Sequence, residues 1–131
     1  MVKNLAILIS HPIQYYAPVF KQLANNPFIN LKVFYSLGKE NLTDKGFGKE
    51  IEWDIPLLDG YQYEFLENTA KDKGTHHFNG IINSDIISRI DSHQPDAILI
   101  YGWANRSHLK SIRHYKNKIP VWFRGDSTLL D

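Results

Sequence analysis

Short, uninterrupted runs of apolar residues recur along the chain and predict strands. Runs of this kind, without turn residues inside them, are typical of strands that are covered on both faces of a parallel sheet. Two such runs occupy residues 5–9 and 97–101, and residues 31–35 and 120–124, which are apolar apart from Lys32 and Arg124, predict two further strands. Weaker strand patterns follow around residues 50–53 and 61–66. The pattern therefore predicts a sheet that lies inside the protein.

Apolar residues at helical spacing fill the gap between the first two runs. Ala17, Phe20 and Leu23 share one face of a predicted helix over residues 16–24. Pro18 fits this helix only because it falls in the first turn, where no intrahelical donor is needed. The strand, helix and next strand together predict a right-handed βαβ unit.

Two further helices are predicted in the second half of the chain. One covers residues 85–93, with Asn83 or Ser84 as its N-cap, and the other covers residues 105–117, with Asn105 as its N-cap. The residues expected to face inward are Ile86, Ile87 and Ile90 in the first helix and Leu109 and Ile112 in the second.

The alternation of strands and helices predicts an α/β fold. We expect a Rossmann-like, open and mostly parallel sheet flanked by helices. The 131 residues fit one domain, spanning 1–131.

Composition narrows the possible partners. Lys and Arg number 15 and Asp and Glu number 14, so a net charge of +1 gives no support for a nucleic-acid partner. The absence of Cys excludes disulfides and thiolate metal sites and suits the cytoplasm. No apolar run approaches the ~20 residues that a membrane-spanning helix needs.

Several motifs that would indicate a nucleotide, a catalytic nucleophile or a metal ion are missing. The sequence has no G-x-G-x-x-G after its first strand, no P-loop, no G-x-S-x-G and no H-x-x-x-H pair. We therefore expect no bound cofactor and no metal ion.

Polar and aromatic residues replace the apolar pattern where three of the predicted strands end. Because ligands bind beyond the carboxyl ends of parallel strands, residues 10–16, 102–105 and 125–127 are expected to open onto one edge. The candidate catalytic residues in and beside these segments are His11 and Asp126. The candidate substrate-binding residues are Gln14, Tyr15, Trp103, Arg124 and Ser127.

Each candidate has a chemical reason and a plainer structural alternative. The imidazole of His11 can accept a proton near pH 7, or it can simply bond to backbone. Trp103 can stack on the C–H face of a sugar or pack between a loop and a helix. Arg124 and Asp126 can contact a substrate or form a surface ion pair with each other. Gln14 and Tyr15 can present backbone donors to a ligand or serve only in capping and packing.

Four segments resemble one group of enzymes, the bacterial glycosyltransferases of the GT-B fold related to glycosyltransferase family 4. The segments are SHPIQYYAP at residues 10–18, GFGKEIEWDIPLLDGY at 46–61, GW at 102–103 and RGDS at 124–127. They follow one another in the order expected for that group and extend over nearly the whole chain.

This resemblance implies an N-terminal domain that binds the sugar acceptor, while a second domain binds the nucleotide-sugar donor. The 131 residues are then expected to be a truncated domain that is inactive by itself. The resemblance also implies a parent protein with peripheral membrane association, and a truncated face through which two copies can dimerise. Two alternatives stay open, a stand-alone flavodoxin-like ligand-binding module and an interaction domain.

Overall fold

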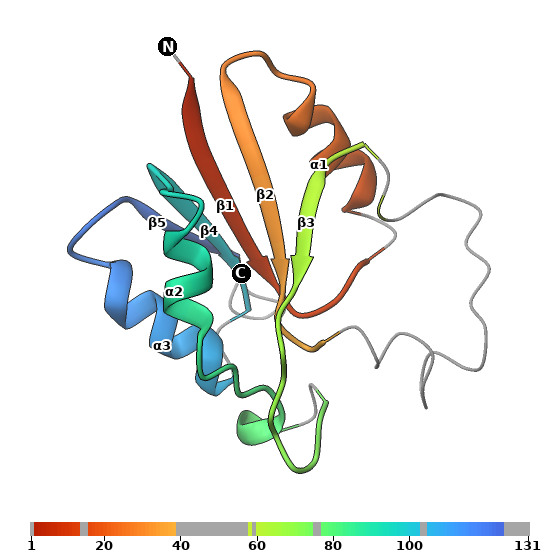
Figure 1. Cartoon of the computed structure of the whole chain (residues 1–131), viewed down its shortest axis with the longest axis vertical. Coiled ribbons are helices and arrows are strands. Elements are labelled where there is room, and N and C mark those ends of the chain that lie inside the picture. Colours follow the sequence, from red (N-terminus) through yellow and green to blue (C-terminus); the bar gives the residue numbers. More distant parts are fainter. Residues whose placement is uncertain are drawn as a thin grey trace.

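A computed structural model describes residues 2–13, 16–38, 58, 60–74, 77–102 and 105–124 (Figure 1). Of Phe123 and Arg124 it describes the backbone only. Within the described residues, five parallel strands form one sheet in the order β3-β2-β1-β4-β5. The strands are β1 (Lys3–Ile9), β2 (Ile29–Tyr35), β3 (Gln62–Phe65), β4 (Ala97–Tyr101) and β5 (Val121–Arg124). The predicted Rossmann-like α/β fold is confirmed.

Helices cover both faces of the sheet. Helix α1 (Ala17–Ala24) lies on one side, and α2 (Ile86–Asp91) and α3 (Arg106–Tyr115) lie on the other (Figure 1). A 3₁₀ turn, η3 (Phe78–Gly80), precedes α2. No helix in the described ranges is long and apolar enough to cross a membrane.

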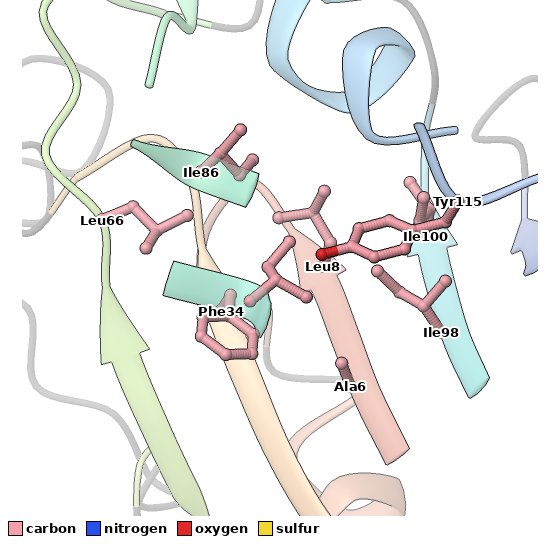
Figure 2. Packing of buried hydrophobic residues seen from close by; sticks show 9 residues of the cluster. Ala6, Leu8, Phe34, Leu66, Ile86, Ile98, Ile100 and Tyr115 are labelled. Carbon is pink, nitrogen blue, oxygen red and sulfur yellow. The ribbon is translucent and has the colours of Figure 1, made fainter. Parts of the chain in front are cut away.

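The apolar runs form strands because both faces of the central strand are buried. In β1, Ala6 and Leu8 face the layer of α2 and α3, whereas Ile7 and Ile9 face α1, and all four are at most 1% exposed. Figure 2 shows the apolar cluster between the sheet and the layer of α2 and α3, in which side chains of the sheet contact Ile86 from α2 and Tyr115 from α3. A strand with no solvated face needs an uninterrupted apolar sequence, as the pattern indicated.

The N-cap predicted for the second helix is wrong. The cap residue of α2 is Asp85, and its side chain makes no capping hydrogen bond. Asn83 is 2% exposed, and its side-chain amide donates hydrogen bonds to carbonyl groups of two other segments. The sequence could not separate these roles, because Asn favours both caps and buried contacts with backbone.

The inward face predicted for the third helix is also wrong in part. Leu109 and Ile112 are only half-buried, although Ile112 packs at the margin of the core. The buried residues of α3 are Ser107, His108, Ser111 and Tyr115. The prediction for Asn105 is confirmed, since its side chain accepts a hydrogen bond from the backbone N–H of His108. The strand predicted at 50–53 lies outside the described residues.

The central position of β1 leads to a first prediction. Leu8→Ala removes a fully buried side chain between two paired strands, so the free energy of unfolding should fall by about 2–5 kcal/mol. Urea denaturation measures this loss. Val19→Ala, at a position that is 45% exposed, is the control and should change stability by less than about 0.5 kcal/mol. Equal effects of the two substitutions would contradict this arrangement of the core.

Candidate functional site

The carboxyl ends of the parallel strands meet at one edge of the sheet, and this edge is the candidate site. Along the chain, β2 and β3 are added on one side of β1, and β4 and β5 are added on the other. The strand order therefore reverses between β1 and β4. In open α/β sheets, ligands bind in the crevice at such a reversal.

His11 lies at this reversal. It follows β1 by two residues and is half-buried, and its Nδ1 lies 2.8 Å from Oγ of Ser10 in a hydrogen bond. The backbone before it is fixed, because Leu37 donates its N–H to the carbonyl of Ser10 at 2.8 Å. The structure thus places a titratable ring at the edge that the sequence indicated.

Aromatic contacts hold the far end of the segment between β1 and α1 (residues 10–16). The ring of Tyr16, just before α1, lies 4.7 Å from the ring of Tyr101 at the end of β4. Phe20 packs against both rings from within α1. The segment that follows β1 is therefore anchored on the α1 side of the sheet, between the ends of β1 and β4.

The remaining predicted residues are placed only in part. Arg124 is the last residue of β5, so its backbone reaches the same edge, next to Tyr101 in the register of β4 and β5. The others lie outside the described residues, and these are Gln14, Tyr15, Trp103, Asp126 and Ser127. The structure thus brings the backbones of His11 and Arg124 to one edge and describes the side chain of His11.

A buried polar cluster lies directly behind this edge, and the sequence analysis missed it. Its members are buried to 2% exposure or less and come from the end of β2, the approach to α2, and α3: Ser36, Asn83, Ser107, His108 and Ser111. One signal was present, since Ser107, His108 and Ser111 fall on one face of a helix. Interpreting this face as buried needed its partners, which lie far away in the sequence.

His108 links the ends of two strands that are not neighbours. Its Nδ1 lies 3.1 Å from the carbonyl oxygen of Tyr101 and 2.9 Å from that of Gly102. Carbonyls only accept, so Nδ1 carries the proton, and the hydroxyl of Ser36 donates to Nε2 at 2.7 Å. The ring therefore joins the end of β2 to the end of β4, with β1 between them.

Gly102 makes this contact possible. Its φ of 81° lies in the left-handed region, which glycine enters without strain from a side chain. The chain turns there immediately after β4, and the Gly102 carbonyl bonds to the imidazole of His108.

The protonation of His108 follows from its surroundings. Complete burial lowers its pKa from 6.5 to about 4, and the two carbonyl hydrogen bonds oppose this shift only in part. The ring is therefore neutral at pH 7, with one nitrogen donating and one accepting. A neutral ring of this kind serves as a fixed cross-link between strands.

Asn83 extends the cluster toward β3. Its Nδ2 donates to the carbonyls of Ser36 at 3.0 Å and Glu67 at 2.7 Å, and its backbone N–H donates to Oγ of Ser107. Among the described residues, no donor reaches its buried Oδ1. The segments after β2 and β3 are thus tied to the start of α3 through one residue, by its side chain on one side and its backbone N–H on the other.

On the opposite face, Tyr35 at the carboxyl end of β2 contacts Tyr61, which directly precedes β3. The hydroxyl groups of Tyr35 and Tyr61 are hydrogen-bonded to each other, and burial raises the pKa of both. Phe20 packs edge-on against Tyr61 at 5.6 Å. These hydroxyl groups stay protonated at physiological pH and act in packing, without proton transfer.

No group of three or more His, Asp or Glu side chains within the described residues has the arrangement of a metal site. No known protein-family model matches the chain, and no curated protein matches it closely enough to count as a relative.

The depressed pKa of His108 predicts a specific loss of stability in acid. Below pH 6.5 the unfolded chain binds a proton at this position and the folded chain does not. Stability should therefore be complete above pH 6.5 and fall toward pH 4, by about 1.4 kcal/mol per pH unit and about 3 kcal/mol in total. His108→Asn keeps a donor for the carbonyls but does not titrate. The difference between the two proteins in urea-derived stability, measured from pH 7 to pH 4.5, should shrink as the pH falls. A difference that is independent of pH would exclude a buried neutral His108.

Ser36→Ala tests the second half of the cross-link. This substitution leaves Nε2 of His108 buried without a donor, which should cost about 1–3 kcal/mol in the free energy of unfolding. Ser84→Ala is the matched control, because Ser84 is exposed and should tolerate the change within about 0.5 kcal/mol. Chemical denaturation at pH 7 measures both, and equal losses would count against the hydrogen bond.

Proposed function

We propose that the edge around Ser10, His11 and Gly102 binds a sugar acceptor, and that the chain is the acceptor-binding, N-terminal part of a glycosyltransferase. The observation that carries this proposal is the position of the Ser10–His11 pair at the reversal of the strand order. The resemblance of residues 10–18 and 46–61 to family 4-like glycosyltransferases supports the same assignment.

The proposed reaction transfers a sugar from a nucleotide-sugar to an acceptor hydroxyl. The hydroxyl oxygen forms a bond to the anomeric carbon, and the bond from that carbon to the phosphate oxygen breaks. The nucleoside diphosphate leaves with the electron pair, and the hydroxyl proton passes to His11. The donor is held by a further domain, as the resemblance implies.

The other candidate residues take roles in this proposal by their places along the chain. Asp126 is the second catalytic candidate and accepts a hydrogen bond from a sugar hydroxyl. Substrate contacts are assigned to Gln14, Tyr15, Trp103, Arg124 and Ser127. Support for these roles comes from the edge that their strands reach and from the resemblance.

The cellular setting is part of the same proposal. We place the parent enzyme in the cytoplasm, because the chain has no Cys, and in peripheral contact with the membrane, because the resemblance implies it. A second copy of the chain is a further proposed partner.

The topology bears on the flavodoxin-like alternative. Flavodoxin-like sheets have the order 2-1-3-4-5, in which the third strand lies next to the first. Over the described strands, β3 lies outside β2 and is separated from β1. This order is that of the Rossmann sheet, so it favours the transferase domain over a flavodoxin-like module.

Titration of the ¹⁵N-labelled chain with simple glycosides tests the proposed function. Millimolar methyl glycosides should shift the backbone amides of Ser10, His11 and Gly102, with a Kd of about 1–10 mM. Uridine diphosphate glucose should cause no comparable shifts and release no uridine diphosphate. His11→Ala should weaken glycoside binding at least fivefold, while His93→Ala, at the amino end of the sheet, should leave it unchanged.

Other outcomes of this titration would reject the proposal. Saturable binding of flavin mononucleotide at the same amides would favour the ligand-binding module. A dimer in light scattering, without any response to glycosides, would favour the interaction domain. Turnover of a nucleotide-sugar by the 131-residue chain would contradict its assignment as the acceptor-binding part.

A further inference from the structure

A hollow opens at the carboxyl ends of β2 and β3, beside the start of α2. It has a volume of about 430 Å³, within the ~300–1,000 Å³ range of small-molecule sites. Its lining comes from the ends of the two strands, the loop that follows β3 and helix α2. The lining residues are Gly38, Phe65, Leu66, Glu67, Asn68, Lys73, Asp85 and Arg89. In Figure 1 the segment after β3 runs down from the sheet and the chain returns upward into α2. We call this hollow the β3 groove.

The floor of the β3 groove is held rigidly by Asn68. This side chain is 6% exposed and donates to the carbonyls of Leu37 at 3.1 Å and Gly80 at 3.0 Å. Its Oδ1 accepts from the backbone of Ala70 and Ile82. All four hydrogen bonds are within the protein, so Asn68 shapes the groove and has no bond to offer a ligand.

Arg89 is similarly committed to the fold. Its guanidinium pairs with Glu64 on β3, and the other oxygen of Glu64 pairs with Lys32 at 2.9 Å. This arrangement fixes α2 against the outer strand. Arg89 therefore forms a wall of the groove with its charge already matched.

Asp85 is the exception among the lining residues. It occupies the N-cap of α2, a position where Asp ordinarily accepts from the helix backbone, but its φ of −106° and ψ of 19° do not suit capping and its side chain makes no cap bond. The carboxylate is half-buried, lines the groove and pairs with no residue that the structure describes. Within the described part of the chain, this carboxylate is therefore an acceptor without a donor.

The described lining offers both acceptors and a donor. The charge of Arg89 is already matched by Glu64, and the remaining charged groups of the lining are the carboxylates of Glu67 and Asp85 and the ammonium group of Lys73. A phosphate or nucleotide would need a positive surplus, which these residues do not supply. A metal ion would need a group of three or more such side chains, and the described residues contain no such group. A neutral ligand with several hydroxyl groups matches the lining, because each hydroxyl both donates and accepts.

We propose that the β3 groove binds a saccharide unit of the acceptor, with Asp85 and Glu67 accepting from its hydroxyl groups and Lys73 donating to it. The choice of a saccharide among neutral polar ligands rests on the proposed function. The unit in the groove is a sugar remote from the reacting hydroxyl, because His11 follows β1, one strand away from β2. The groove thereby selects acceptors that carry more than one sugar.

The test compares a monosaccharide with disaccharides on the ¹⁵N-labelled chain. Methyl glucoside, maltose, cellobiose and lactose are titrated separately, with inorganic phosphate as the anionic probe. At least one disaccharide should shift the amides of Glu67, Asp85 and Arg89 and bind at least fivefold more tightly than the monosaccharide. Asp85→Asn and Lys73→Ala should remove this gain, while Lys71→Ala, two residues away and outside the lining, should preserve it.

The outcomes separate this inference from the proposed function. Shifts confined to Ser10, His11 and Gly102 would overturn the β3 groove as a saccharide site and leave the acceptor edge standing. Shifts confined to the groove would support the groove and count against the acceptor edge. A response of the groove to phosphate but to no sugar would overturn the inference, and silence at both places would reject both. Thermal unfolding of each variant confirms that it is folded before binding is compared.

Discussion

The carboxyl edge depends on the hydrogen bonds of one buried ring. His108 fixes the backbone at the ends of two strands there, by bonding Ser36 after β2 and Gly102 after β4. Strand β1 lies between these two strands, so His108 lies behind the end of β1 on the side of α3. On the other side of the sheet, Tyr16 just before α1 contacts Tyr101. The edge at the strand reversal is thus supported from behind by a residue that takes no part in the proposed binding.

Local pattern predicted the strands because their burial is a local property. Ala6 to Ile9 have no solvated face, so every position must be apolar, and such a run is visible in any short window of sequence. Helix α1 was predicted for a similar reason, since Ala17 and Phe20 are buried at helical spacing. The Asn105 cap was predictable too, because its partner is the backbone three residues later.

The buried polar cluster was not predictable, because the hydrogen-bond partners that offset the cost of burying its polar groups lie far away in the sequence. Ser36 and His108 are 72 residues apart, and Asn83 is 47 residues from the Ser36 carbonyl that it contacts. Within α3, Leu109 and Ile112 have the apolar character expected of a buried face, but the sheet edge has carbonyl and hydroxyl groups that need a ring with one donor and one acceptor. The same contrast separates the two proposed binding places. The position of the edge that contains His11 could be predicted from the ends of the strands. The β3 groove is formed by four separate segments, so no sequence pattern indicates it.

The place of β1 in the sheet also affects the order of events during synthesis. Its first partner, β2, follows within the same βαβ unit, but its second partner is β4, and Asn4 and Asp96 at the start of that pairing are 92 residues apart. At a translation rate of about 5–20 residues per second, one hydrogen-bonding edge of β1 waits roughly 5–20 s for its partner to be made. An unpaired apolar edge is where strands of neighbouring chains add. The central position that buries both faces of β1 in the folded protein therefore leaves one of its edges open to misassembly until β4 has been made.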